Sequence, residues 1–121
     1  MNKYRDKSDF EINCQVLAIF EPDIEHMCLS NDEKSFYHCG FDGNGFYETI
    51  IPDYCNNPAD AYPIIFENKI NINFRESIKT GVMVELSGWS EVYSINENPL
   101  RAAMEVFLMM KEAENENNNN S

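Results

Sequence analysis

Residues 98–110 read NPLRAAMEVFLMM, and this stretch decides the class of fold. Asn98 can cap a helix and Pro99 suits the first helical position, so a helix is predicted to begin here. After the proline, only Arg101 and Glu105 interrupt the apolar residues. They are four apart, so they share one helix face and can form an ion pair. A helix that is apolar nearly all round lies in a core or at an interface.

Two more helix starts lie upstream of this one. Residues 57–58 repeat the Asn-Pro pair, and Pro63 follows past the first turn, where it predicts a 3₁₀ start or a kink. Ser8 and Glu11 have the spacing of a capping box. Apolar residues then recur at helical spacing, which predicts a helix over residues 9–20.

The segments between these helices favour strands. Residues 25–29 and 35–39 are expected to form a hairpin, and a turn at 40–45 leads to a strand at 46–51. Further strands are expected at 69–74, 82–86 and 89–95, with Ser87-Gly88 as a break between the last two. The predicted fold class is α+β, with about three helices packed on an antiparallel sheet of about four to six strands. We expect a single domain over residues 1–113 and a disordered Asn/Glu-rich tail over 114–121.

The chain of 121 residues carries 21 acidic and 9 basic side chains, which gives a net charge of -12. This charge repels phosphate backbones, so direct nucleic-acid binding is disfavoured. It is compatible with solubility alone, with a basic protein partner, or with mimicry of nucleic acid. The polar start lacks the apolar stretch of a secretory signal, and no apolar run has membrane-spanning length. We therefore expect a cytoplasmic protein with reduced thiols and no membrane association.

No motif in the chain assigns catalytic residues, a cofactor or a metal. The four cysteines form no CxxC pair. A zinc site could use His26, Cys28, His38 and Cys39, but neighbours in a strand point to opposite faces, which disfavours a shared site. Phosphate-loop, dinucleotide-binding and HExxH motifs are absent from the sequence. We therefore expect no metal and no cofactor, and a non-enzymatic role.

The start of the middle helix concentrates the residues that could bind a small ligand. The candidates in this segment are Tyr54, Asn56, Asn57, Asp60 and Tyr62. A helix N-terminus offers free backbone amides and positive potential to an anion. However, Asp60 competes for that potential, and the alternative is that these residues only cap the helix and form a turn.

Trp89 and Arg101 complete the set of candidate binding residues. Trp89 could offer a stacking surface, but a tryptophan of this kind more often belongs to a core or an interface. Arg101 is a lone cation in an apolar helix, and we expect it to pair with a nearby acid rather than to bind a ligand.

Three blocks of the sequence resemble the NinX-like family, whose members are small proteins of tailed phages and prophages of enteric bacteria. The blocks are SDFEIN (8–13), CNNPADAYPII with ENKI (55–65 and 67–70), and NPLRAAM with VFLMM (98–104 and 106–110). Residues 21–54 carry little of the resemblance, and Tyr62 stands where tryptophan is more often expected. The resemblance implies a phage accessory protein that acts in the cytoplasm of the bacterial host, and it supplies no catalytic residues.

Two hypotheses about function remain open from the sequence. In the first, the protein binds a host protein or complex without being an enzyme, and could inhibit a host defence or nucleic-acid enzyme. In the second, it binds or sequesters a nucleotide-type ligand at the helix start at Asn57. Homodimerisation is compatible with both hypotheses.

Overall fold

The computed structural model describes residues 2–38, 48–76, 83–89 and 92–119, and for residues 75–76, 83–87, 89 and 117–119 it describes the backbone alone. The helices are α1 (Asp9–Phe20), the 3₁₀ helix η1 (Pro22–His26), α2 (Pro58–Glu67) and α3 (Pro99–Asn119). The strands are β1 (Cys28–Leu29), β2 (Ser35–Tyr37), β3 (Glu48–Ile50), β4 (Asn71–Glu76), β5 (Met83–Trp89) and β6 (Val92–Asn96). The predicted α+β class with three α-helices is confirmed.

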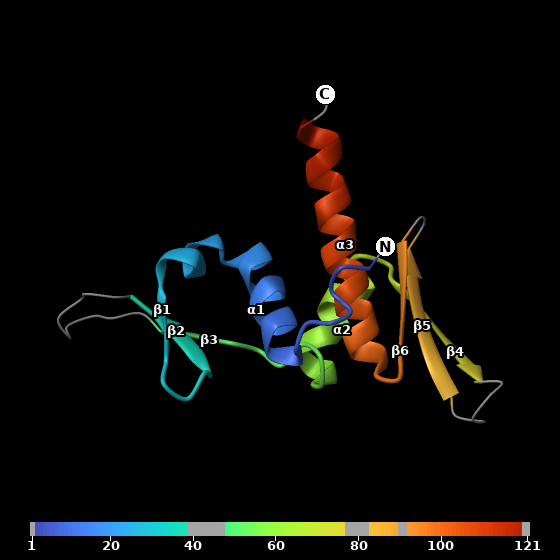
Figure 1. Cartoon of the computed structure of the whole chain (residues 1–121), viewed down its shortest axis with the longest axis horizontal. Helices are drawn as coiled ribbons and strands as arrows, with labels where there is room; N and C mark the ends of the chain where they lie inside the picture. The colour runs from blue at the N-terminus through green and yellow to red at the C-terminus, as the bar shows by residue number, and fades with distance from the viewer. Residues whose placement is uncertain (1, 39–47, 77–82, 90–91, 120–121) are drawn as a thin grey trace.

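The six strands of the described residues form two antiparallel sheets rather than one. One sheet has the order β1-β2-β3 and the other β4-β5-β6. The helix α3 packs against β5 and β6, and α1 and α2 both pack against α3. The small sheet β1-β2-β3 lies at the opposite end of the molecule from β4-β5-β6, with the helices between them (Figure 1). The expectation of one antiparallel sheet is therefore wrong, because α1, α2 and α3 lie between the two groups of strands (Figure 1).

The start of α1 forms as its sequence predicts. The Ser8 hydroxyl accepts a hydrogen bond from the backbone N–H of Glu11 at 3.1 Å, and the Glu11 carboxylate accepts one from the backbone N–H of Ser8 at 3.5 Å. These two bonds make up the predicted capping box. The helix ends at Phe20, immediately before the segment that contains Pro22.

The helix α2 also begins at its predicted residue, but Pro63 does not interrupt it. The α-helix is continuous from Pro58 to Glu67. The carbonyl oxygen of Asn57 accepts from the N–H groups of both Asp60 and Ala61, at 3.0 and 3.1 Å. The first turn thus combines a 3₁₀-type and an α-type bond, and no separate 3₁₀ segment precedes the helix.

Two strand predictions need correction. Residues 25–26 belong to η1 rather than to a strand, because Pro22 starts a turn of 3₁₀ helix in which the Met27 N–H bonds to Ile24. The expected break at Ser87-Gly88 does not occur, because Gly88 pairs with Tyr93 and β5 continues to Trp89. Pairing on both sides holds this strand together despite the glycine. The turn predicted at 40–45 lies outside the described residues.

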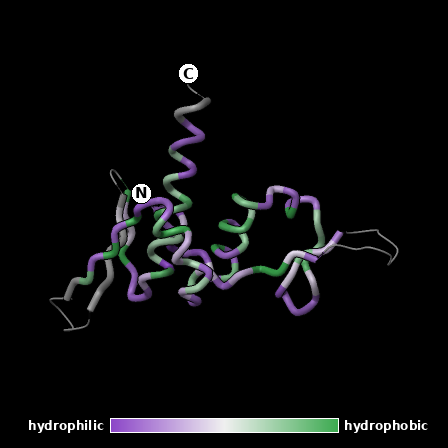
Figure 2. Tube along the Cα trace, turned by 180° about the vertical axis from the view of Figure 1, so that it is seen from behind, coloured by the Kyte–Doolittle hydropathy of each residue, from purple (hydrophilic) through white to green (hydrophobic). Residues whose placement is uncertain are grey.

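The core forms where α1, α2 and α3 meet. Fully buried side chains include Ile12, Cys55 and Phe107. Figure 2 shows hydrophobic residues in the first part of α3, beside the other elements, and hydrophilic residues toward its C-terminal end. The helix continues to Asn119, so residues 114–119, expected in a disordered tail, are helical. No helix breaker stands between the core part of α3 and this extension, so the helix can propagate.

The cysteines differ from the expectation of four reduced thiols. Cys14 and Cys55 are free thiols, whereas Cys28 is disulfide-bonded. The expectation is therefore wrong for Cys28. A disulfide depends on how close the fold brings two cysteines, and spacing along the sequence does not show this distance.

Candidate functional site

The polar residues at the start of α2 bond mainly to one another and to the chain around them. The Asn57 side-chain oxygen accepts from the N–H of Ala59 at 3.1 Å, which caps the helix. The Asp60 carboxylate accepts from the backbone N–H of Asp53, also at 3.1 Å. Both side chains therefore take part in the capping and turn chemistry that the sequence allows.

Asn56 connects the two Asn-Pro helix starts. Its side-chain N–H donates to the carboxylates of Asp9 and Asp53, at 3.2 and 3.1 Å. Its side-chain oxygen accepts from the amide of Asn98 at 3.0 Å, and that same amide donates to the carbonyl oxygen of Cys55 at 2.7 Å. The N-termini of α2 and α3 are thus fastened side by side, with the start of α1 beside them.

The candidate aromatic residues do not share one exposed surface. Tyr54 is only 7% exposed and belongs to the core. Tyr62 is 48% exposed on α2 and contacts Phe66 edge-on, with ring centroids 5.6 Å apart. Trp89 ends β5 opposite Val92, and its side chain lies outside the described part of the structure. Tyr54 therefore offers no open ring face to a ligand at the Asn57 segment.

Arg101 is buried, and all three of its guanidinium nitrogens donate hydrogen bonds inside the protein. Its Nε donates to the Glu105 carboxylate at 2.6 Å, and its Nη1 donates to Asp9 at 2.6 Å. Its Nη2 donates to the carbonyl oxygens of Tyr4 and Lys7, at 3.0 and 2.6 Å. The two carboxylates hold the pKa of Arg101 above its ordinary value against the effect of burial. This side chain clamps the N-terminal segment onto α3.

Glu105 continues the network toward β6. It is 1% exposed, and the oxygen that does not bind Arg101 accepts from the Ser94 hydroxyl at 2.8 Å and from the Asn2 amide at 2.5 Å. A buried carboxylate is stable only when it is paired and hydrogen-bonded, and Glu105 meets both conditions. Arg101 and Glu105 together hold the N-terminal residues 2–7 in place beside β6.

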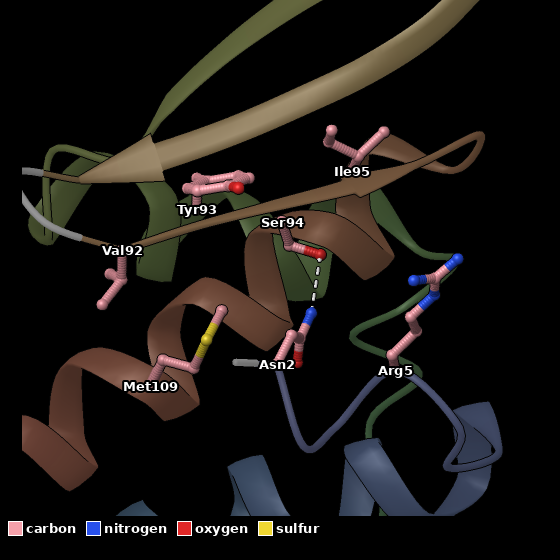
Figure 3. A pocket seen from close by; sticks show the side chains of 7 residues that line it. All are labelled: Asn2, Arg5, Val92, Tyr93, Ser94, Ile95 and Met109. Carbon is pink, nitrogen blue, oxygen red and sulfur yellow. Dashed lines mark hydrogen bonds between the residues drawn. The ribbon is translucent and has the colours of Figure 1, made fainter.

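A cleft of about 450 Å³ lies between β6 and the N-terminal segment (Figure 3). Its lining comes from Val92–Ile95 of β6, from Asn2 and Arg5, and from Met109 of α3. Figure 3 shows Tyr93 and Ile95 on one side of β6, and Val92 and Ser94 on the side that faces α3. Tyr93 and Ile95 are 64% and 50% exposed. Among the described residues, the cleft therefore combines a strand edge, exposed apolar side chains and one cation, Arg5.

None of the cleft residues was among the candidates predicted from the sequence. A signal for part of it exists, because VYSIN at 92–96 alternates large and small side chains and contains no charge and no proline. The opposite wall leaves no such signal. It depends on bonds between the first residues and α3, about a hundred positions away in the chain.

Tyr4 also holds the N-terminal wall, through its hydroxyl, which donates to Glu112 at 2.9 Å. Burial, followed by the hydrogen bond and charge of Glu112, raises the pKa of Tyr4 from 10.0 to about 12. The fold therefore favours the neutral phenol. This contribution to stability is fully present below pH 10 and is lost as the pH rises toward 12.

Unfolding in urea should reveal this dependence. Between pH 10 and 12, we expect the free energy of unfolding to fall more steeply for the unchanged protein than for Tyr4→Phe, which has no phenol proton to lose. Other groups that titrate in this range affect both proteins equally, so the difference between the two curves isolates Tyr4. Parallel curves would contradict the assignment.

The fold and the cleft define a small acidic α+β protein whose described residues contain no group of three metal-binding side chains and no helix able to cross a membrane. The family model for bacteriophage P22 NinX matches residues 3–111. The chain therefore belongs to the phage P22 NinX family, and the resemblance drawn from the three sequence blocks is confirmed.

A phage protein from Bacillus cereus ATCC 14579, known from a 2.0 Å crystal structure, is similar in structure to this chain. The two are 13% identical, with a TM-score of 0.46, and the match covers 84% of this chain and 89% of the other. No curated protein matches the sequence.

Proposed function

We propose that this phage protein acts without enzymatic activity by binding a host protein in the cytoplasm of the infected bacterium, and that the cleft beside β6 is its binding site. The observation that supports this proposal is the exposure of Tyr93 and Ile95 next to an open strand edge. Tyrosine is enriched at the energetically important centres of protein interfaces. The surrounding wall is fixed by the buried Arg101–Glu105 pair, which gives the cleft the preformed shape that binding sites usually have.

The charge of the chain supports a basic partner. A net charge of -12 steers the protein toward positively charged surfaces and away from nucleic acid. Host enzymes that act on nucleic acid carry such surfaces, so inhibition of a defence or nucleic-acid enzyme is the proposed consequence of binding.

Photo-crosslinking in the host tests this function. A benzophenone amino acid at position 93 should form an adduct with the same host protein in repeated experiments. The matched control is position 66, because Phe66 is an aromatic residue on α2 that is 73% exposed. Equal adducts from both positions, or none from position 93, would contradict the proposal. An adduct of twice the chain mass would identify the partner as a second copy instead.

A further inference from the structure

β6 is the edge strand of its sheet, and its outer side faces the cleft. β5 pairs with the inner side of β6. The paired residues run from Trp89 opposite Val92 at one end to Glu85 opposite Asn96 at the other. In an antiparallel ladder, alternate residues direct their N–H and C=O groups away from the paired neighbour. Among the described residues, no backbone hydrogen bond joins the outer groups of β6 to another segment. They can therefore bond an added strand.

The sequence of β6 does nothing to prevent such pairing. Proteins usually protect an edge strand with lysine, proline or a bulge. VYSIN contains neither a charged residue nor proline, and its valine, tyrosine and isoleucine all favour extended structure. Addition of a strand to an open edge is an established mode of peptide recognition, in which the backbone gives affinity and alternate side chains give specificity.

The walls of the cleft favour a single peptide over a second copy of this chain. Asn2 and Arg5 line the cleft opposite β6. A second copy would have to bring β6 together with its paired strand β5 into the space between β6 and the N-terminal segment, whereas a peptide brings one strand. Two chains with a charge of -12 also repel each other. An extended peptide needs only the spacing of one more strand, about 4.8 Å.

Arg5 indicates the charge of the peptide. Arg5 is exposed. Of the described residues that line the cleft, it is the one with a charged side chain. Its side chain makes no hydrogen bond or ion pair with any described residue. Its neighbours Lys3 and Lys7, by contrast, pair with Glu112 and Glu11. A guanidinium group binds a carboxylate through two parallel hydrogen bonds.

We propose that the cleft binds an extended segment of the basic host partner, which pairs with β6 as a fourth strand and places one Asp or Glu side chain against Arg5, while the partner stays basic over the rest of the surface that meets this acidic chain. Every second side chain of this peptide packs beside Tyr93 and Ile95. This inference rests on the proposed function, because it specifies which part of the host protein the cleft holds.

The inference can be tested by selecting peptides that bind the full-length protein from a random library. The peptides are nine residues long, and they are acetylated and amidated so that they carry no terminal charge. Enriched peptides should contain one acidic residue among β-branched or aromatic residues. Fluorescence anisotropy should show that Arg5→Gln weakens their binding roughly tenfold or more. Replacing the acidic residue of the peptide by its amide should weaken binding by the same factor. Combining this peptide with Arg5→Gln should weaken binding no further, because each change removes the same contact. The control Lys34→Gln, an exposed cation in the loop before β2, should leave binding unchanged.

Amide hydrogen exchange shows where the peptide lies. A bound peptide should slow exchange in residues 92–96 and leave α2 unchanged. The inference is overturned if no acidic peptide is enriched, if Arg5→Gln binds equally well, or if protection appears elsewhere. If peptides fail while the crosslink at position 93 persists, strand addition is wrong and the proposed function stands. If peptides bind but no host adduct forms, the strand inference stands and the proposed function fails.

Discussion

Replacing Arg101 with methionine is expected to lower the free energy of unfolding by about 3–5 kcal/mol, which is the usual cost of breaking a buried ion pair from one side. The substitution keeps an unbranched side chain of similar length but removes every bond to Glu105 and Asp9. Glu105 would then be a carboxylate that is 1% exposed with no cation beside it. Urea unfolding at pH 7 measures the loss.

A second substitution separates charge from packing. Arg101→Met combined with Glu105→Leu removes both charges, so much of the lost stability should return. Lys7→Met serves as the control, because its ion pair with Glu11 spans 3.9 Å at the surface and should contribute less than about 1 kcal/mol. If the single and double variants are equally unstable, the bonds of Arg101 to the Tyr4 and Lys7 carbonyl oxygens carry the stability instead.

The same arginine links stability to the proposed binding site. Its bonds to the carbonyl oxygens of Tyr4 and Lys7 hold the segment that forms one wall of the cleft. Glu105 accepts hydrogen bonds from Asn2 in that segment and from Ser94 of β6, and the Asn2 amide also donates to the Ser94 hydroxyl at 3.2 Å, so the two walls of the cleft are joined to each other. A cleft built in this way keeps its shape before a ligand arrives, which reduces the entropy lost on binding.

The features that the sequence predicts well are those that depend on neighbouring residues. The starts of all three helices follow from Ser8, Asn57 and Asn98, because a capping side chain acts within three positions of itself. The ion pair of Arg101 with Glu105 is also local, since one helical turn separates the two. Local chemistry of this kind can be read without knowing the fold.

The features that the sequence does not predict depend on distant contacts. β5 runs through Gly88 because Tyr93 pairs with it, and the division into two sheets depends on how α2 and α3 pack. The cleft requires Asn2 to meet Glu105, which is 103 positions away. The candidate residues at Asn57 stand out in the sequence by their composition, whereas the structure shows that most of their polar atoms bond within the protein.

Replacing Phe107 with alanine is the second change expected to have a large effect, with a loss of about 3–5 kcal/mol in the free energy of unfolding. Phe107 is 1% exposed, and its ring stacks on Phe20 of α1 with centroids 5.8 Å apart. Truncation would leave a cavity between α1 and α3 and would remove the stacking contact. Thermal and urea unfolding both measure the loss.

Two further variants make this prediction specific to the α1–α3 contact. Phe66→Ala removes an equally large ring that is 73% exposed, so its effect should stay within about 0.5 kcal/mol. Phe107→Leu keeps most of the volume and should recover a large part of the stability. If Phe107→Ala is as mild as Phe66→Ala, then α1 does not depend on α3 for its place in the fold. In that case the loss expected for Arg101→Met would be the larger of the two.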